Sequence, residues 1–124
     1  MTRTILISTA LAAITLASAA VALGRTDSAP TLNGTVGPGF TISLAKSGKK
    51  VTSLKAGSYK FVVADKAAIH NFVLEKEKGG TFERAITSVP FNGTKTVTIK
   101  LTAGTWKYYC KPHESMMHGE FKVK

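Results

Sequence analysis

The sequence predicts an all-β protein that folds as an antiparallel β-sandwich. Apolar and polar residues alternate in six short segments, as they do in strands that bury one face. Glycine-containing turns separate these segments at short intervals, and no segment carries a convincing helical period. This combination excludes a fold in which strands alternate with helices, and the length of 124 residues suits one small domain.

The strands are expected where the alternation is clearest. In chain order, the six segments are 40–44, 59–63, 70–74, 95–101, 105–110 and 119–123. In the fourth segment, Val97, Ile99 and Leu101 face one side while lysines and threonines face the other. Turns are expected at Gly48, Ala56-Gly57, Gly79-Gly80, Asn92-Gly93 and Ala103-Gly104. Residues 64–69 form one helical turn at most, so we expect a fold that is almost free of helix.

The first 22 residues have the composition of an export signal. Arg3 is the only charged residue among them, and residues 5–22 are Ile, Leu, Ala and Val diluted by four hydroxyl residues. The small-x-small pattern at 17–19 and at 20–22 is the one that signal peptidase reads. We therefore expect residues 1–22 to be a cleaved signal peptide whose cut site stays open, with an uncleaved membrane anchor as the alternative. The protein would then be exported to the periplasm or to the outer face of the cytoplasmic membrane.

The rest of the chain divides into a lead-in and a domain. Residues 23–33 are expected to be a flexible lead-in, because Gly24, Asp27 and Pro30 interrupt any regular period. Residues 34–124 are expected to form the single folded domain. All six Phe, all three Tyr and the one Trp lie beyond residue 22, which is enough for one hydrophobic core.

The charges of the chain are strongly unbalanced, with 17 Lys and Arg against 7 Asp and Glu and a formal net charge of +10. An exported protein has little occasion to meet nucleic acid, and the sequence contains no Gly-rich phosphate loop and no Arg-rich arm. We therefore expect no nucleic-acid partner, but partner proteins with acidic docking surfaces. A peripheral contact with an anionic membrane is a further expectation, and the protein is expected to be a monomer.

The sequence has a single cysteine, Cys110, at the end of an expected strand. One cysteine excludes an intramolecular disulfide, a four-cysteine zinc or iron-sulfur site and a two-cysteine redox motif. The loop that follows, residues 111–119, also carries His113, Met116 and Met117. One loop therefore offers a thiolate, an imidazole and a thioether, all of which are metal ligands.

A second imidazole comes from a different strand. His70 shares a strand face with the apolar Phe72 and Leu74, so we expect it to point inward at one end of the sandwich. Two imidazoles and a thiolate, with a weak thioether above them, form the ligand set of a trigonal copper site that cycles between Cu(I) and Cu(II). Each residue alone fits an ordinary packing role, but packing does not require this combination.

Two other kinds of site compete with copper. Zinc accepts two histidines and a cysteine, yet it has little use for methionine. A cysteine hydrolase would need an orienting group and an oxyanion site, and neither accompanies Cys110 and His113. We therefore expect a mononuclear copper protein that is not an enzyme.

Four motifs together carry a resemblance to a known family. They are His70-Asn71-Phe72, Tyr108-Tyr109-Cys110, Cys110-Lys111-Pro112-His113 and Met117-His118-Gly119-Glu120-Phe121. With them the sequence resembles the plastocyanin-like cupredoxins, which are small blue copper proteins, over residues 34–124. The resemblance implies an eight-strand Greek-key sandwich with one copper ion near one end. It also implies that His70, Cys110 and His113 hold the copper with an axial methionine, and that Asn71 braces the copper loop and orients the cysteine.

The sequence departs from its relatives at the axial methionine. Four residues separate the loop histidine from the methionine in plastocyanin-like chains, and two do in amicyanin-like chains. Here two residues separate His113 from Met116, and three separate it from Met117. We predict that Met117 is the axial ligand, because its place before His118-Gly119 matches the family's step into the last strand, with Met116 as the alternative. His118 itself is expected at the surface, where it could tune the potential or hold a second metal loosely.

These expectations converge on an exported copper protein that carries one electron at a time between redox partners. In the family, the histidine that matches His113 lies within an apolar docking patch, and Pro112, Met116 and Met117 fit such a patch. The alternative is a copper-handling protein of the cell envelope, which would bind Cu(I) for delivery or protection. A cupredoxin fold that has lost its metal and serves as a binding module is the third interpretation.

Overall fold

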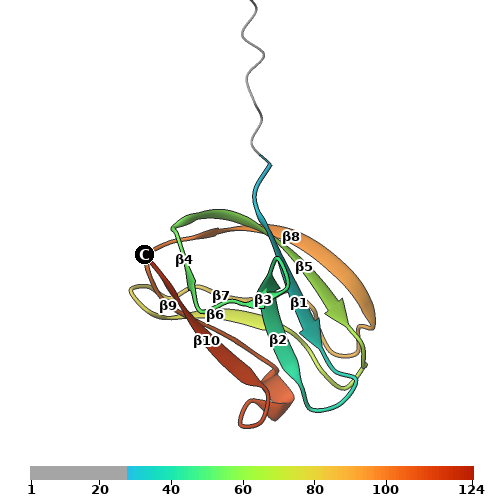
Figure 1. Ribbon diagram of the computed structural model, residues 1–124. Coiled ribbons are helices and arrows are strands. Elements are labelled where there is room, and N and C mark those ends of the chain that lie inside the picture. Colours follow the sequence, from blue (N-terminus) through green and yellow to red (C-terminus); the bar gives the residue numbers. More distant parts are fainter. Residues whose placement is uncertain (1–27) are drawn as a thin grey trace, which may run out of the picture.

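The structure, a computed structural model, describes residues 28–124, which form a β-sandwich of two five-stranded sheets (Figure 1). The predicted all-β sandwich is confirmed. The predicted signal peptide, residues 1–22, and the start of the lead-in lie outside the described residues. Within residues 28–124, no helix is long and apolar enough to cross a membrane.

Ten strands and one short 3-10 helix, η1, follow one another along the described chain. They are β1 (Thr31–Val36), β2 (Ile42–Lys46), β3 (Lys49–Lys50), β4 (Ser53–Leu54), β5 (Gly57–Asp65), β6 (Val73–Lys78), β7 (Glu83–Ala85), β8 (Gly93–Leu101), β9 (Gly104–Tyr109), η1 (Lys111–His113) and β10 (His118–Val123). Because β3 and β4 have two residues each, eight longer strands remain, the number that the family resemblance implies.

The two sheets have the strand orders β3-β2-β1-β5-β8 and β4-β10-β9-β6-β7. Most neighbouring strands are antiparallel, as expected, but β1 pairs with β5 and β4 with β10 in parallel. Parallel neighbours cannot be joined by a tight turn, so the local sequence gives no sign of these two pairs. The described chain enters at one end of the sandwich, and the loop that contains η1 lies at the other end (Figure 1).

The first strand corrects the expected lead-in. Residues 31–33, which the sequence places in a flexible segment, form the first half of β1 and pair with β5. Leu32 and Val36 are fully buried, so this strand contributes to the core. Its apolar alternation is diluted by Asn33 and Gly34, which are both poor strand formers, so the sequence pattern alone does not predict this strand.

The strand expected at residues 70–74 begins three residues later, at Val73. The preceding segment is held by a loop instead of a strand, because the Phe72 amide donates to Oγ1 of Thr87 (2.9 Å) and the Phe72 carbonyl accepts from the Ile86 amide (2.8 Å). A side-chain hydroxyl thus replaces one ladder bond. The expected inward direction of His70 is nevertheless confirmed, since none of its surface is exposed.

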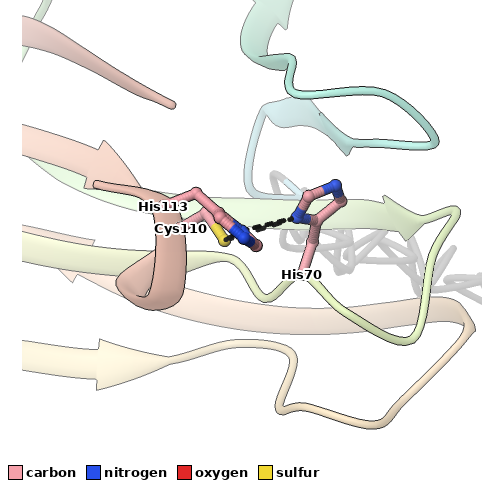
Figure 2. Close-up of side chains that lie close together, drawn as sticks. All are labelled: His70, Cys110 and His113. Carbon is pink, nitrogen blue, oxygen red and sulfur yellow. Dashed lines mark hydrogen bonds between the residues drawn. The ribbon is translucent and has the colours of Figure 1, made fainter. Parts of the chain in front are cut away.

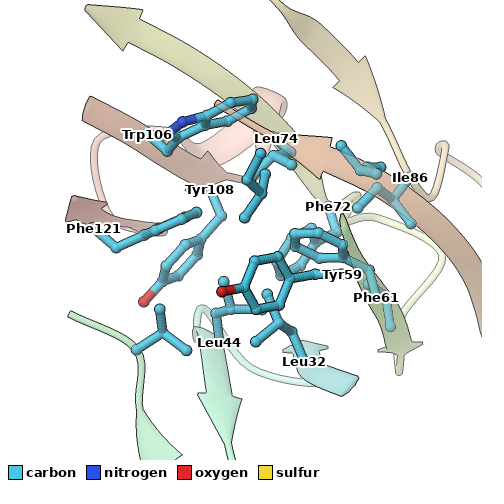
Figure 3. Close-up of a cluster of buried hydrophobic side chains, with 14 of the residues drawn as sticks. Leu32, Leu44, Tyr59, Phe61, Phe72, Leu74, Ile86, Trp106, Tyr108 and Phe121 are labelled. Carbon is cyan, nitrogen blue, oxygen red and sulfur yellow. The ribbon is translucent and has the colours of Figure 1, made fainter. Parts of the chain in front are cut away.

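Aromatic side chains fill much of the space between the two sheets (Figure 3). The Phe72 and Tyr108 rings are stacked with their centroids 5.8 Å apart, and Trp106 stacks on Phe121 at 6.5 Å. A side chain at Gly119 would overlap the Tyr108 ring. The glycine in the Met-x-Gly step therefore has a packing role, because it lets β10 pass close to this ring.

Candidate metal centre

Three potential metal ligands meet at the end of the sandwich where η1 lies (Figure 2). The Nδ1 atoms of His70 and His113 are 3.1 Å apart, and Sγ of Cys110 lies 3.7 Å from each of them. His70 and Cys110 are fully buried, while His113 is partly exposed. His70 lies in the loop three residues before β6, and Cys110 directly follows the neighbouring strand β9. The three residues that the sequence predicted as ligands are therefore brought together by adjacent strand ends.

Backbone hydrogen bonds give the ligand loop its shape. The His113 amide donates to the Cys110 carbonyl (3.2 Å), and this turn brings the imidazole back towards the sulfur. Pro112 suits the first turn of η1, where an amide N–H would lack a helical partner. The amides of Met116 and Met117 both donate to the His113 carbonyl, and the Cys110 amide donates to the Met117 carbonyl (3.0 Å). The loop is thus closed on itself at the base of the site.

The donor set suits a soft metal ion. The Nδ1 atoms of His70 and His113 are 3.1 Å apart, and a cation held among the three donor atoms would accept a lone pair from each imidazole. No carboxylate belongs to this cluster, and its third member is a sulfur. Two imidazoles and one thiolate in a trigonal arrangement are the ligands of a mononuclear copper centre. The residues present therefore fit a copper ion.

Asn71 connects the two halves of the site. Its Oδ1 accepts a hydrogen bond from the Lys111 amide at 2.8 Å, and the side chain is almost completely buried. The bond joins the residue after His70 to the residue after Cys110. Asn71 therefore braces the copper loop against the segment that carries the other histidine.

The two methionines of the loop differ sharply in burial. Met117 is fully buried and belongs to the hydrophobic core, whereas Met116 is 60% exposed. A thioether that approaches an inward-facing centre must itself face inward. Burial therefore favours Met117 as the axial ligand, and this assignment stays a prediction.

A comparison of the sequence with models of protein families supports a copper site. Residues 41–124 match the model of the copper-binding proteins of the plastocyanin/azurin family. The chain belongs to this family. It is a cupredoxin, and His70, Cys110 and His113 are positioned to bind its single copper ion.

Solved structures of copper proteins share the fold of this cupredoxin. Rusticyanin matches with a TM-score of 0.55 and 19% identity, over 76% of each chain. Auracyanin A from Chloroflexus aurantiacus matches with a TM-score of 0.51 and 23% identity, over 78% of this chain and all of that one. A Cu(I) form of an amicyanin mutant matches with a TM-score of 0.50 and 16% identity, over 77% and 83% of the two chains. A search of the curated proteins finds no match.

Phe40 is a site residue to which the sequence did not point. The sequence places it in a strand, but it lies in the loop before β2, with 52% of its surface exposed. Its ring meets the His70 and His113 rings edge-on, with centroid distances of 5.5 Å and 4.9 Å. Phe40 thus covers one side of both imidazoles. Turn residues just before it, Pro38 and Gly39, are the signal that could have placed it in a loop.

His118 lies at the surface, as the sequence predicts. Its Nδ1 donates to the Glu114 carbonyl at 2.8 Å, so the side chain is tied to the copper loop and does not join the three central ligands.

Replacing Asn71 with alanine is expected to loosen the copper loop of this cupredoxin. The Lys111 amide loses its acceptor, which we expect to lower the free energy of unfolding by about 1–2 kcal/mol and to speed the loss of copper to a chelator. Chemical denaturation and chelator competition measure the two effects. Asn33→Ala, at an exposed position of β1, is the control and should change neither quantity. Equal behaviour of the two variants would contradict the bracing role.

Glutamates gather on the outer face of the sheet that contains β6, β9 and β10. Lys107 lies at the centre of this group, opposite Glu75 on one neighbouring strand and Glu120 on the other. Its Nζ donates to Oε1 of Glu114 (2.6 Å) and lies 3.8 Å from Glu77. The hydrogen bond to Glu114 raises the pKa of Lys107. Although the chain is basic, this face is therefore acidic and is linked through Glu114 to the copper loop.

Glu120→Gln is expected to change how stability depends on pH. The contact with Glu120, together with burial, raises the pKa of Glu77 above its ordinary 4.5. A raised pKa means that the folded state favours the protonated carboxyl, so this stabilisation is complete below pH 4.5 and is lost as the pH rises through the raised pKa. Between pH 4 and 7, the free energy of unfolding measured in urea should therefore fall less with rising pH for the variant than for the wild type. Identical pH profiles would refute the coupling.

Proposed function

We propose that this cupredoxin is an exported one-electron carrier, in which bound copper alternates between Cu(I) and Cu(II). The observation that supports the proposal most directly is the ligand set, which is buried except for part of His113 and is held in place by the sandwich and by the loop's own hydrogen bonds. Ligands fixed in this way move little when the charge of the bound ion changes. A small rearrangement on electron transfer makes that transfer fast in both directions.

Exposed apolar side chains support electron exchange at the copper end. Phe40, Ile69, Val89 and Met116 are the large apolar residues that are most exposed within residues 28–124, at 45–60%. They lie in the loops before β2, before β6, before β8 and before β10, which meet at this end of the two sheets. We call these four residues the apolar patch. Because His113 is partly exposed and contacts Phe40, a partner that covers the patch comes close to a copper ligand.

The site of action proposed is the cell envelope, in the periplasm or on the outer face of the cytoplasmic membrane. The proposal rests on the export signal expected in residues 1–22. The redox partners are proposed to carry acidic docking surfaces that attract the basic chain. Increasing the salt concentration should then slow association. A rate that does not change with salt would show that charge does not steer the encounter.

Electron self-exchange tests the carrier function without a known partner. The exported protein is first loaded with Cu(II), and an intense visible band with reversible reduction is expected. Met116→Lys adds a positive charge to the apolar patch, so two molecules that meet there repel each other, and we expect self-exchange to slow by roughly tenfold or more. The control, Ser58→Lys, adds the same charge at the exposed start of β5, at the opposite end. Equal slowing in both variants would contradict exchange through the patch.

A copper-handling protein is the second candidate, and one observation favours it. The Met116 thioether and the His118 imidazole are both exposed beside the buried ligands, where they could receive or release Cu(I). Competition with a Cu(I) chelator separates the two functions. Tight Cu(I) retention without a stable Cu(II) form, together with slower metal transfer in Met116→Leu, would support handling over electron transfer.

A further inference from the structure

A cavity of about 510 Å³ opens far from the copper centre. It is lined by Pro30, Lys46, the segment from Lys49 to Lys55, and Tyr59, so it lies between the entry of the described chain and the start of β5. Tyr59 lies near the start of β5, whereas Asp65 ends β5 and leads into the loop that carries His70. The two lie six positions apart along the strand, which corresponds to about 20 Å. The cavity and the copper ligands therefore occupy opposite ends of the sandwich.

The lining of this cavity is strongly basic. Four exposed lysines contribute to it, namely Lys46, Lys49, Lys50 and Lys55, and no aspartate or glutamate does. None of the four forms an ion pair within the described residues, whereas Lys107 on the other sheet forms two. We call these four residues the lysine groove. The hydroxyls of Thr52 and Ser53 add neutral hydrogen-bond donors beside the charges.

The backbone around the groove is well defined. The Tyr59 hydroxyl donates to the Lys55 carbonyl at 2.7 Å, and the Lys60 amide donates to the Pro30 carbonyl at 2.8 Å. These bonds tie the rim of the groove to β5 and to the entering chain. The four lysines thus extend from an ordered backbone beside a cavity that can admit a phosphate group.

We propose that the lysine groove binds the phosphate headgroups of an anionic phospholipid surface. Each lysine near such a surface strengthens binding by roughly fivefold, so four acting together are enough for peripheral attachment. The copper ligands then face away from the membrane, where soluble partners can reach them. The inference does not depend on the electron-carrier function, because it concerns the opposite end of the protein.

Two observations favour a membrane over an acidic redox partner at the groove. A redox partner seated there would be separated from the copper end by most of the length of β5, about 20 Å, and electron transfer slows steeply with distance. The described chain also enters the fold beside the groove, since Pro30 lines it. If residues 1–22 are retained as an anchor, they join the domain at this end and place the groove next to the membrane.

Vesicle binding by the exported, copper-loaded protein tests the proposal. Vesicles of phosphatidylcholine with about one third phosphatidylglycerol should bind the wild type, and vesicles of phosphatidylcholine alone should not. Lys49→Gln with Lys50→Gln should weaken binding by roughly 20- to 30-fold. The control, Lys66→Gln with Lys95→Gln, removes the same charge from exposed positions near the copper end and should bind almost as the wild type does. Equal weakening of the two variants would overturn the proposal, because net charge alone would then explain the binding.

Chemical acetylation of lysines locates the bound face without any substitution. On anionic vesicles, mass spectrometry should show protection of the four groove lysines, while Lys66 stays reactive. Equal protection by inorganic phosphate would overturn the proposal of a membrane ligand and would identify a free phosphate ion instead. Binding to polyglutamate without binding to vesicles would also overturn the proposal, because the groove would then recognise an acidic protein.

Discussion

Replacing Cys110 with serine is expected to abolish the intense visible absorption of the Cu(II)-loaded protein. Sγ of Cys110 lies 3.7 Å from Nδ1 of both His70 and His113, and it is the only sulfur in the cluster of three ligands. A copper–thiolate bond supplies that absorption, and a serine hydroxyl is a hard, weak donor that does not replace it. We also expect affinity for Cu(I) to fall by orders of magnitude, because the remaining protein donors of this cluster are two imidazoles.

The serine variant should still fold. The substitution changes the side-chain volume little, and an unpaired buried hydroxyl costs about 1–3 kcal/mol. Absorption and EPR spectra with added Cu(II), alongside chemical denaturation of the metal-free protein, separate loss of the site from loss of the fold. His118→Gln serves as the control, since this exposed side chain lies outside the ligand cluster and its variant should keep the band. An intense band that survives in Cys110→Ser would refute the assignment, since the sequence contains no other cysteine.

The ligand set could be predicted because its chemistry is concentrated in one short loop. Cys110 and His113 are three residues apart, so any turn that reverses the chain between them brings their side chains together. His70 required one more step, which was the inference that it faces inward with Phe72. That step succeeded although the strand begins only at Val73, since burial of the face, and not strand pairing, sets the direction of the imidazole.

Other parts of the structure depend on contacts that leave no local pattern. β1 has a weak alternation and exists because it pairs with β5, which lies more than twenty residues further along the chain. Phe40 reaches the two imidazoles through the turn that precedes β2, and no periodicity of the sequence encodes that contact. The positive net charge likewise gives no sign of the acidic face around Lys107, because this face forms only when β6, β9 and β10 pair in register.

The second large effect that we expect concerns Met117 and Met116, which are adjacent and chemically identical but differ in burial. Met117→Ala should lower the free energy of unfolding of the metal-free protein by about 2–5 kcal/mol, since it empties a fully buried position in the core. Met116→Ala removes the same atoms from a side chain that is 60% exposed, so its effect should stay within about 0.5 kcal/mol. Urea denaturation without copper measures this difference free of any metal–ligand bond.

Leucine substitutions then separate packing from ligation. Met117→Leu nearly conserves volume, so the metal-free protein should lose less than about 1.5 kcal/mol. If the thioether is the axial ligand, the copper-loaded variant should nevertheless show a higher reduction potential and an altered visible spectrum, because a donor that stabilises Cu(II) has been removed. Met116→Leu should leave both unchanged. If the potential and spectrum respond to Met116→Leu and not to Met117→Leu, the axial ligand is Met116, and the burial of Met117 serves the core alone.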